Sequence, residues 1–259
     1  MSRFIRELYK DFKSYMPGEQ PKDRKYLKLN TNESPFPPAS EVYQAMRDAD
    51  MEQMRLYPDP TGSKLKGKLA QLYKVQPGNI FLSNGSDDIL NFAFMAWNDL
   101  ADTLVIPDVT YSFYEVAAKL HEVNYEIKPL KEDLTVDWQG YIGIGKNLIL
   151  PNPNAPTGIA LTRVQIEAIV NSNPDNVIVI DEAYAVSLTV KYDNLLVVQT
   201  FSKSRSFAGG RLGLAVGDEA LIQDLTKMQY STNPYAVNAM SLILAEAAVD
   251  ADPYYQENL

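Results

Sequence analysis

The sequence predicts an α/β protein, a three-layer sandwich with a mostly parallel central sheet. Short apolar segments alternate with helical segments over most of the chain, which is typical of a sheet covered by helices on both faces. Residues 177–180, Val-Ile-Val-Ile, are continuously apolar, as expected of a strand buried on both faces. The 259 residues suffice for a substantial core, in one large domain or two modest ones.

The expected elements follow one another along the chain. We predict helices at residues 39–54, 63–73, 88–97, 111–122, 163–170, 218–228 and 236–249. We predict strands at residues 80–82, 104–107, 123–130, 148–150, 177–180, 195–198 and 212–216. Residues 57–62, Tyr-Pro-Asp-Pro-Thr-Gly, have the composition of a turn.

These elements divide the chain into three expected regions. Residues 1–40 carry many charges and a proline cluster, and we predict an N-terminal arm that packs on something else, such as a partner subunit. Residues 41–235 hold the alternating strands and helices and are predicted to form the large, ligand-binding domain. Residues 236–259 are predicted to be a helix leading toward a C-terminal small domain that lies beyond this chain.

The composition excludes several classes of function. The net charge of -9 argues against non-specific binding to nucleic acid or to anionic membranes. The absence of cysteine excludes disulfides, thiol nucleophiles and zinc–thiolate sites, and with His121 as the one histidine we expect no metal site and no catalytic triad. No apolar run approaches the ~18 residues of a membrane span, and the first residues lack the apolar core of a signal peptide. We therefore expect a cytoplasmic protein.

The most informative residue is Lys203, which follows the strand predicted at residues 195–198. Hydroxyl side chains surround it in the run Thr-Phe-Ser-Lys-Ser, and Arg211 follows in a glycine-rich turn. A lysine that forms an imine with a phosphate-bearing aldehyde needs a restricted amine, small hydroxyl donors and a fixed cation. The segment therefore predicts a pyridoxal-phosphate site.

Two further polar clusters follow predicted strands, where ligands gather in open α/β sheets. Residues 83–87, Ser-Asn-Gly-Ser-Asp, open a helix, and backbone N–H groups there can bind an anion. An ordinary helix cap by Ser86 or Asp87 explains the same residues. Residues 152–158 contain two prolines, and Asn154 can donate to a phenolate-like oxygen; a rigid turn into the next helix is the alternative.

An acidic pair, Asp181 and Glu182, comes directly after the most apolar strand. A carboxylate at that point can pair with a protonated pyridine nitrogen. Such a pair at ~4 Å is worth about 4 kcal/mol at an effective dielectric near 20, or about three pKa units. That is enough to keep a weak base protonated at neutral pH. The alternative is an acid that caps the following segment.

The order of these clusters resembles that of the fold-type-I pyridoxal-phosphate aminotransferases, whose large domain is of the aspartate-aminotransferase type. The resemblance is strongest to the histidinol-phosphate aminotransferases and runs from about Tyr15 to the end of the chain. The motifs that carry it lie at residues 29–35 (Leu-Asn-Thr-Asn-Glu-Ser-Pro), 57–59 (Tyr-Pro-Asp), 84–87, 107–114 (Pro-Asp-Val-Thr-Tyr-Ser-Phe-Tyr), 151–158, 181–184 (Asp-Glu-Ala-Tyr) and 202–211.

The resemblance implies a role for each candidate residue. Lys203 would bind the cofactor covalently and then act as general acid and base, and Asp181 would pair with the ring nitrogen. The other residues implied in cofactor binding are Tyr111 on the ring face, Tyr184 and Asn154 at the phenolic oxygen, and Gly85, Ser86, Thr200, Ser202 and Arg211 around the phosphate. Asp87 is also a candidate cofactor-binding residue. Tyr57 would reach the site of a partner subunit in a homodimer, and Tyr15 and Asn32 would line the substrate side.

The chain departs from the family pattern at two places. Ala155 stands before Pro-Thr-Gly, where related aminotransferases carry the asparagine that contacts the ring, so Asn154 is the candidate replacement. The family also continues into a small domain that supplies an arginine for the substrate carboxylate, and this chain ends before it.

The resemblance implies exchange of an amino group between L-glutamate and imidazole-acetol phosphate, in histidine biosynthesis. Two alternatives remain at this point. One is another enzyme on the same fold, an aromatic aminotransferase or a phospho-amino-acid decarboxylase. The other is a non-catalytic domain that only binds cofactor or dimerises.

Overall fold

A seven-stranded sheet forms the centre of the molecule. The computed structural model describes residues 2–99, 102–182 and 191–258. In spatial order the strands of the described part are β1 (Ile80–Ser83), β7 (Gly213–Gly217), β6 (Leu195–Thr200), β5 (Ile178–Asp181), β4 (Leu148–Pro151), β2 (Thr103–Pro107) and β3 (Asn124–Lys128). Strand β7 is antiparallel to both of its neighbours, and the pairs from β6 to β3 are parallel. The predicted α/β sandwich with a mostly parallel sheet is confirmed.

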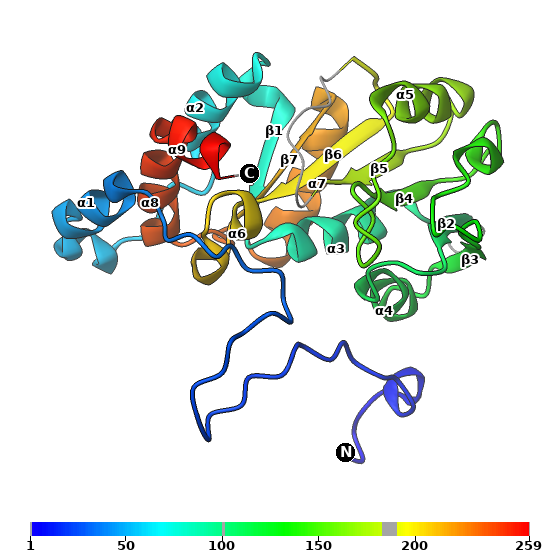
Figure 1. The fold of residues 1–259 in the computed structure, drawn as a ribbon, viewed down its shortest axis with the longest axis horizontal. Helices are drawn as coiled ribbons and strands as arrows, with labels where there is room; N and C mark the ends of the chain where they lie inside the picture. The colour runs from blue at the N-terminus through cyan, green and yellow to red at the C-terminus, as the bar shows by residue number, and fades with distance from the viewer. Residues whose placement is uncertain (1, 100–101, 183–190, 259) are drawn as a thin grey trace.

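Helices cover both faces of this sheet (Figure 1). One face carries α3 (Ser86–Trp97), α4 (Phe113–Leu120) and α7 (Glu219–Thr232). The other face carries α2 (Ser63–Tyr73), α5 (Arg163–Ser172) and α8 (Ala239–Asp250), with α1 (Ser40–Asp48) and α9 (Asp252–Glu257) outside them. The one-turn helix α6 (Phe201–Ser204) follows β6 directly. Five 3-10 helices complete the described part: η1 (Glu7–Tyr9), η2 (Met51–Arg55), η3 (Pro77–Asn79), η4 (Trp138–Tyr141) and η5 (Ala208–Gly210).

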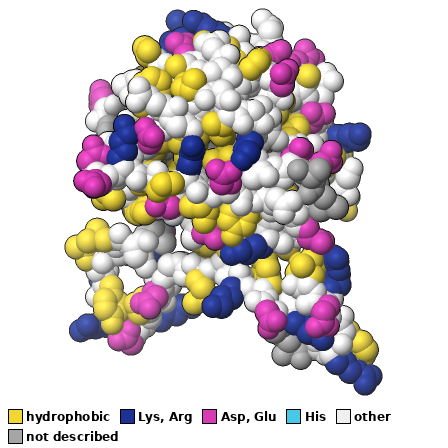
Figure 2. Space-filling model, turned by 90° about the vertical axis from the view of Figure 1, so that its right-hand side faces the viewer, with side chains coloured by type: hydrophobic (Ala, Val, Ile, Leu, Met, Phe, Trp, Pro, Cys, Tyr) yellow, Lys and Arg dark blue, Asp and Glu magenta, His cyan; other side chains and the backbone are white. Residues whose placement is uncertain are grey.

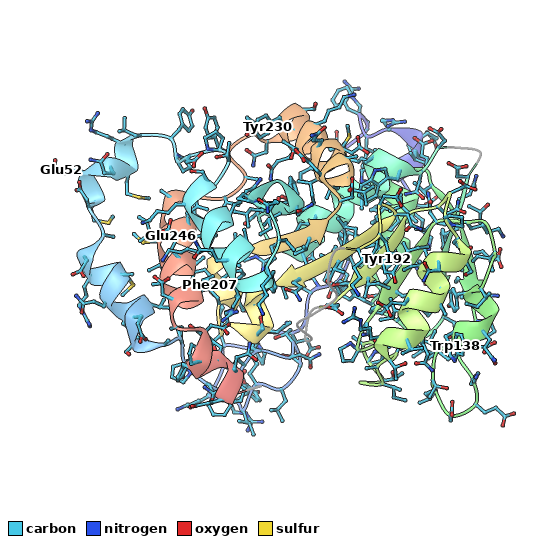
Figure 3. All side chains as sticks on the ribbon, turned by 90° about the horizontal axis from the view of Figure 1, so that it is seen from above. Glu52, Trp138, Tyr192, Phe207, Tyr230 and Glu246 are labelled. Carbon is cyan, nitrogen blue, oxygen red and sulfur yellow. The ribbon has the colours of Figure 1, made fainter. Side chains whose placement is uncertain are left out.

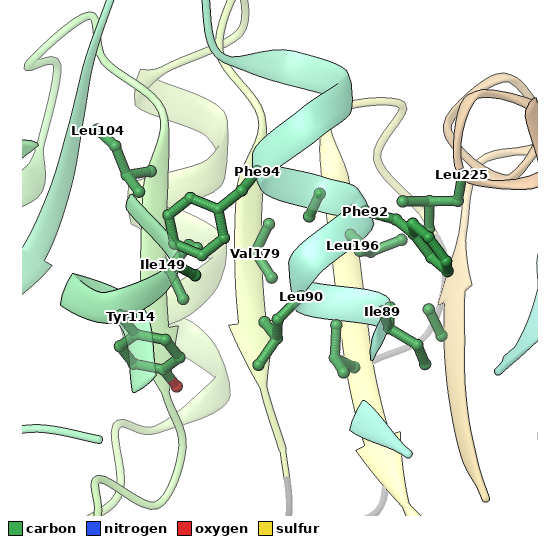
Figure 4. Packing of buried hydrophobic residues seen from close by; sticks show 14 of the residues in the cluster. Ile89, Leu90, Phe92, Phe94, Leu104, Tyr114, Ile149, Val179, Leu196 and Leu225 are labelled. Atoms are coloured by element: carbon green, nitrogen blue, oxygen red, sulfur yellow. The ribbon is translucent and has the colours of Figure 1, made fainter. Parts of the chain in front are cut away.

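The alternation of side chains along each strand divides the core between the two faces. In β5, Val179 points toward α3 and α4, whereas Ile178 and Ile180 point toward α5. Figure 4 shows Val179 beside Phe94 and Leu90 of α3 in the first of these layers. Because strand residues alternate, Asp181 lies on the same face as Val179, the face that α3 and α4 cover.

The second layer is closed by α8, which packs against α1 and α2. Phe207, labelled in Figure 3, is buried in this apolar cluster with side chains of β1, β7 and α8. An ion pair of 2.5 Å joins Lys64 of α2 to Glu246 of α8, also labelled there. The helix predicted at 236–249 therefore packs on the sheet domain.

Several element boundaries differ from the sequence prediction. The helix expected at residues 39–54 is interrupted, because the Asp50 side chain accepts a hydrogen bond from Glu52 N and starts η2 afresh. Helix α3 begins at Ser86 with Gly85 as its N-cap, so the alternative of a cap by Ser86 or Asp87 is wrong. The helix expected over residues 236–259 is divided, because α8 ends at Asp250 and α9 starts at Asp252 with a proline in its first turn.

Residues 10–39 contain no helix or strand, and part of this segment loops out from the sheet domain (Figures 1 and 2), while Tyr15 and Thr31 contact it. This agrees with the character of an arm, although the division of the chain into regions at residues 40 and 235 remains a prediction. No helix in the described ranges is long and apolar enough to cross a membrane.

Candidate active site

The sheet register brings the predicted clusters to one edge. Asp181 ends β5, and the last residue of β4, Pro151, pairs with it. Gly213 of β7 pairs with both Thr200, the end of β6, and Ser83, the end of β1. The segments that follow these strand ends, with Lys203 among them, therefore start side by side although they are far apart in the sequence.

A narrow cradle lies where Gly85, Arg211 and the start of α3 meet. Gly85 has a φ of 92°, which favours glycine, and a Cβ added to it would lie 2.6 Å from Nη2 of Arg211. A Cβ on Gly213 would lie 2.4 Å from the carbonyl carbon of Gly85 and 2.5 Å from the Ser86 nitrogen. Thr200 and Ser202 place hydroxyls nearby: Thr200 Oγ1 accepts a hydrogen bond from Ser202 N, and Ser202 Oγ lies 3.5 Å from Nη1 of Arg211. A guanidinium beside a helix N-terminus in a space without Cβ atoms fits a phosphate group.

Lys203 lies half-buried beside this cradle, on α6. Its Nζ donates a hydrogen bond of 2.6 Å to the carbonyl oxygen of Thr31 in the N-terminal arm. Burial lowers the pKa of Lys203, while the carboxylates of Glu33 and Asp87 act in the opposite direction. A lysine with a lowered pKa is neutral, and hence nucleophilic, at a lower pH than a solvent-exposed one.

Asp181 is a buried carboxyl with one oxygen engaged and one open. Its Oδ2 accepts a hydrogen bond of 2.7 Å from the hydroxyl of Tyr114, and its Oδ1 is buried with no hydrogen-bond partner among the described residues. Burial raises the pKa of Asp181 to about 6, against the effect of the Tyr114 hydrogen bond. A buried carboxyl with one open acceptor fits a cationic ring nitrogen.

An aromatic wall stands next to Asp181. The Tyr111 ring meets Tyr114 edge-on, with 5.6 Å between centroids, and lies roughly parallel to Phe113 at 5.8 Å. The Tyr111 hydroxyl donates to Asp87 Oδ1 at 3.1 Å, and burial raises the pKa of Tyr111. The ring of Tyr15, from the arm, meets Tyr111 edge-on at 5.8 Å. The structure thus brings Tyr15, Tyr111 and Asp87 together.

The hydrogen bonds of Asn154 differ from those that the sequence predicts. Its Nδ2 already donates to Val109 O at 2.9 Å and to Thr157 Oγ1 at 3.2 Å. The atom without a partner in the described part of the chain is Oδ1, an acceptor. In this arrangement Asn154 holds the loop to the segment after β2 and has no donor left for a phenolate oxygen. Tyr184, the other residue expected there, lies outside the described residues.

Two predicted residues lie apart from this cluster or at its margin. Tyr57 is 80% exposed and stacks on Tyr235; in the described residues no hydrogen bond or ring contact joins it to the other predicted site residues. Asn32, with a φ of 52°, follows Thr31, whose carbonyl contacts Lys203.

Two contacts of the site were not predicted from the sequence. Tyr114 lies on the apolar face of α4, and its pattern is that of a core residue. The Thr31 contact involves a backbone carbonyl, which leaves no trace in the residue type. Tyr114 lies in the motif at residues 107–114, but nothing in that motif distinguishes the hydroxyl that meets Asp181.

Comparison with known proteins identifies the family of the chain. The chain belongs to the aminotransferase class I and II family, which it matches over residues 24–259. It is 47% identical over 267 residues to a histidinol-phosphate aminotransferase of Brachyspira hyodysenteriae, covering 100% of this chain and 75% of that protein. It is 47% identical over 258 residues to the Syntrophus aciditrophicus enzyme of the same name, covering 95% and 72%.

Solved structures share the fold. The histidinol-phosphate aminotransferase of Sinorhizobium meliloti, in complex with pyridoxal-5'-phosphate, superposes with a TM-score of 0.80 at 23% identity over 88% of this chain and 65% of that one. Aspartate aminotransferase from Thermotoga maritima gives 0.74 at 22% identity, over 87% and 67%. The sheet domain therefore has the aspartate-aminotransferase type of fold, as expected.

Proposed function

We propose that this chain carries the catalytic site of a histidinol-phosphate aminotransferase, which exchanges an amino group between L-glutamate and imidazole-acetol phosphate. Two relatives with that name match the chain over 95–100% of its length at 47% identity. The observation that carries the proposal is the position of Lys203, with a half-buried amine of lowered pKa, at the sheet edge where the Arg211 cradle and Asp181 lie.

The residues present fit pyridoxal phosphate as the cofactor. When bound, this group supplies an aldehyde that condenses with primary amines and a ring that withdraws electrons from the attached carbon. Arg211, Ser86 and the backbone at Gly85 would hold its phosphate, and Thr200 and Ser202 would complete the cradle. Tyr111 would cover the ring, and the open oxygen of Asp181 would accept from the ring nitrogen.

Lys203 has two roles in this proposal. Its neutral amine would hold the cofactor, because burial disfavours the charged form. Once free, Nζ would move the proton between the reacting carbons. The hydrogen bond to the Thr31 carbonyl gives Nζ a place to rest within the site. Asn32 and Tyr15, beside Thr31 and Tyr111, are the proposed substrate contacts on the arm side.

A homodimer is part of the proposal. An exposed apolar surface follows α1 and includes Met51, Met54, Leu56 and Tyr57, which are 45–80% exposed. Burial of such a patch against a second copy would remove apolar area from water. It would also take Tyr57 to the phosphate cradle of the partner. A cytoplasmic location follows from the proposed biosynthetic role.

Reductive trapping tests the cofactor claim. We expect borohydride treatment of the protein loaded with pyridoxal phosphate to fix one cofactor per chain, on the peptide that contains Lys203. Lys203→Ala should retain none, and Lys128→Ala, which removes a lysine on β3, should trap as the wild type does. Trapping on another lysine, or undiminished trapping by Lys203→Ala, would refute the assignment.

Substrate assays separate the alternatives. Transfer from L-glutamate to imidazole-acetol phosphate, measured beside transfer to phenylpyruvate and release of carbon dioxide from phospho-amino acids, distinguishes the three enzyme activities. Full trapping without turnover of any substrate would instead identify a domain that binds cofactor only.

A further inference from the structure

Within the described part of the chain, the hydroxyl of Tyr114 makes a single hydrogen bond, and its partner is Asp181, the acid proposed to meet the ring nitrogen. The Tyr114 side chain has 0% exposure, and its hydroxyl donates to Asp181 Oδ2 at 2.7 Å. Figure 4 shows the ring at the margin of the apolar cluster that includes Ile149 and Leu90, with the hydroxyl at its outer end. The ring therefore belongs to the core, while the oxygen belongs to the site.

This hydrogen bond decides which oxygen of Asp181 remains available. A carboxylate has two equivalent oxygens and can turn about the bond that carries it. The side chain of Asp181 is buried, with 6% exposure, so water does not readily replace a missing partner. With Oδ2 taken by Tyr114, Oδ1 is the buried oxygen left without a partner in the described residues.

We propose that Tyr114 is a positioning residue for the cofactor ring: its hydroxyl holds Oδ2 of Asp181 and thereby presents Oδ1 as the acceptor for the ring nitrogen. The inference rests on the proposed function, because it needs a pyridine-type ligand. Tyr114 itself makes no contact with that ligand in this account and acts through Asp181.

A tyrosine suits this role because it is neutral. A lysine, arginine or protonated histidine at position 114 would pair with the Asp181 charge and compete with the ring cation. The Tyr114 hydroxyl donates without cancelling that charge. Burial, together with the neighbouring Asp181 carboxylate, raises the pKa of Tyr114 well above its usual value, so the hydroxyl stays a donor. The hydrogen bond from Tyr114 also lowers the pKa of Asp181, against the effect of burial, which raises it.

Tyr141 provides a matched control. It is also a buried tyrosine, with 1% exposure, but it packs in the cluster beneath α5, and its hydroxyl has no hydrogen-bond partner among the described residues. Tyr114→Phe and Tyr141→Phe therefore remove the same atom from two similar environments. Only the first change takes a donor from Asp181. Phenylalanine keeps the ring, so both variants retain the packing of their clusters.

The test compares two ligands that differ at the ring nitrogen. Dissociation constants are measured by fluorescence titration for pyridoxal phosphate and for its 1-deaza analogue, in which a carbon replaces that nitrogen. The wild type should prefer pyridoxal phosphate. Tyr114→Phe should reduce this preference by about 10- to 100-fold, the range expected for a hydrogen bond to a charged group, and leave the affinity for the analogue unchanged. Tyr141→Phe should match the wild type with both ligands.

A double variant completes the test. Asp181→Asn should remove the preference, and adding Tyr114→Phe to it should change nothing further, because Tyr114 acts through that carboxylate. An equal loss of affinity for both ligands in Tyr114→Phe would show a packing effect and overturn the inference, as would an unchanged preference. A wild type that does not bind pyridoxal phosphate, or that binds both ligands equally, would instead overturn the proposed function.

Discussion

The ring of Tyr57 lies flat on the ring of Tyr235, with 4.4 Å between centroids and 18° between planes. Tyr57 precedes α2 and Tyr235 precedes α8, so the stack joins two turns that are far apart in the sequence. Although 80% of Tyr57 is exposed, one face of its ring is fixed. A rigid aromatic side chain on an open surface is suited to insertion into a neighbouring molecule, because little conformational freedom is lost on binding.

Mixed dimers test whether Tyr57 acts in the partner's site. We expect Lys203→Ala and Tyr57→Ala homodimers each to trap little or no cofactor. If Tyr57 serves the opposite subunit, a mixed dimer of the two variants contains one site with both residues intact. Mixing should therefore restore trapping, by borohydride reduction, toward one cofactor per two chains.

The result differs if Tyr57 serves its own chain, because every site of the mixed dimer then lacks one of the two residues. No recovery on mixing would exclude the cross-subunit role, provided that light scattering shows dimers. Lys203→Ala mixed with Tyr43→Ala, which removes an exposed tyrosine of α1, shows how much trapping a partner with intact Tyr57 allows.

Asp59 holds the turn that carries Tyr57. Its carboxylate accepts four hydrogen bonds, from the nitrogen and hydroxyl of Thr61 at 2.9 and 2.7 Å and from those of Ser63 at 2.8 and 2.7 Å. These bonds lower the pKa of Asp59, the Ser63 hydroxyl most. Asp59→Ala should therefore destabilise the fold by about 1 kcal/mol at pH 7, as loss of a helix cap does, and should weaken cofactor binding by the dimer.

The sign of the pH dependence follows from the lowered pKa. The contribution of Asp59 is present above the pKa of the unfolded chain and is lost as the pH falls through the folded value, so wild type and variant should converge in strong acid. Urea unfolding at pH 7 and in strong acid measures the loss of stability and its pH dependence. Asp133→Ala is the control, because Asp133 accepts similar bonds from Thr135 in an exposed loop. Equal losses of cofactor affinity in both variants would contradict a role through Tyr57.

Gly85→Ala tests the phosphate cradle. The new Cβ would lie 2.6 Å from Arg211 Nη2 at a backbone φ of 92°, so either the guanidinium or the turn must move. We expect a loss of about 1–2 kcal/mol in the free energy of unfolding and at least a similar loss in pyridoxal-phosphate binding. Gly209→Ala is the matched control, since a Cβ there meets no atom within 4 Å. Normal cofactor affinity in Gly85→Ala would rule out this cradle as the phosphate site.

The strand-end clusters could be predicted from the sequence because polar residues after apolar strands collect at one edge of a parallel sheet. Lys203, Asp181 and Arg211 are recognised by residue type and by their place after β5 and β6. Other parts of the site depend on three-dimensional contacts that residue type does not encode. Tyr114 has the pattern of a core residue, and the donors of Asn154 are taken by Val109 and Thr157, whose proximity only the folded loop determines.

Asp181→Asn should make the cofactor-free protein more stable at neutral pH. Burial raises the pKa of Asp181 from 3.8 to about 6, so between these values the folded chain keeps a proton that the unfolded chain releases. Raising the pH through this window therefore lowers the free energy of unfolding, by about 3 kcal/mol for a shift of about two pKa units.

Asparagine does not titrate and can still accept from Tyr114, so the variant should match the wild type near pH 4 and exceed it by that amount above pH 7. Glu182, whose pKa burial and the neighbouring Asp181 carboxylate raise to about 7, titrates in both proteins, and the loss of that neighbour adds to the gain of the variant at neutral pH. Urea unfolding at the two pH values measures the effect, and Asp99→Asn, at an exposed carboxyl, should show none. If the variant is less stable than the wild type at both pH values, groups of the folded site stabilise the ionised Asp181 carboxylate. A gain confined to neutral pH would mean that stability is sacrificed to keep a buried negative charge ready for a cationic ligand.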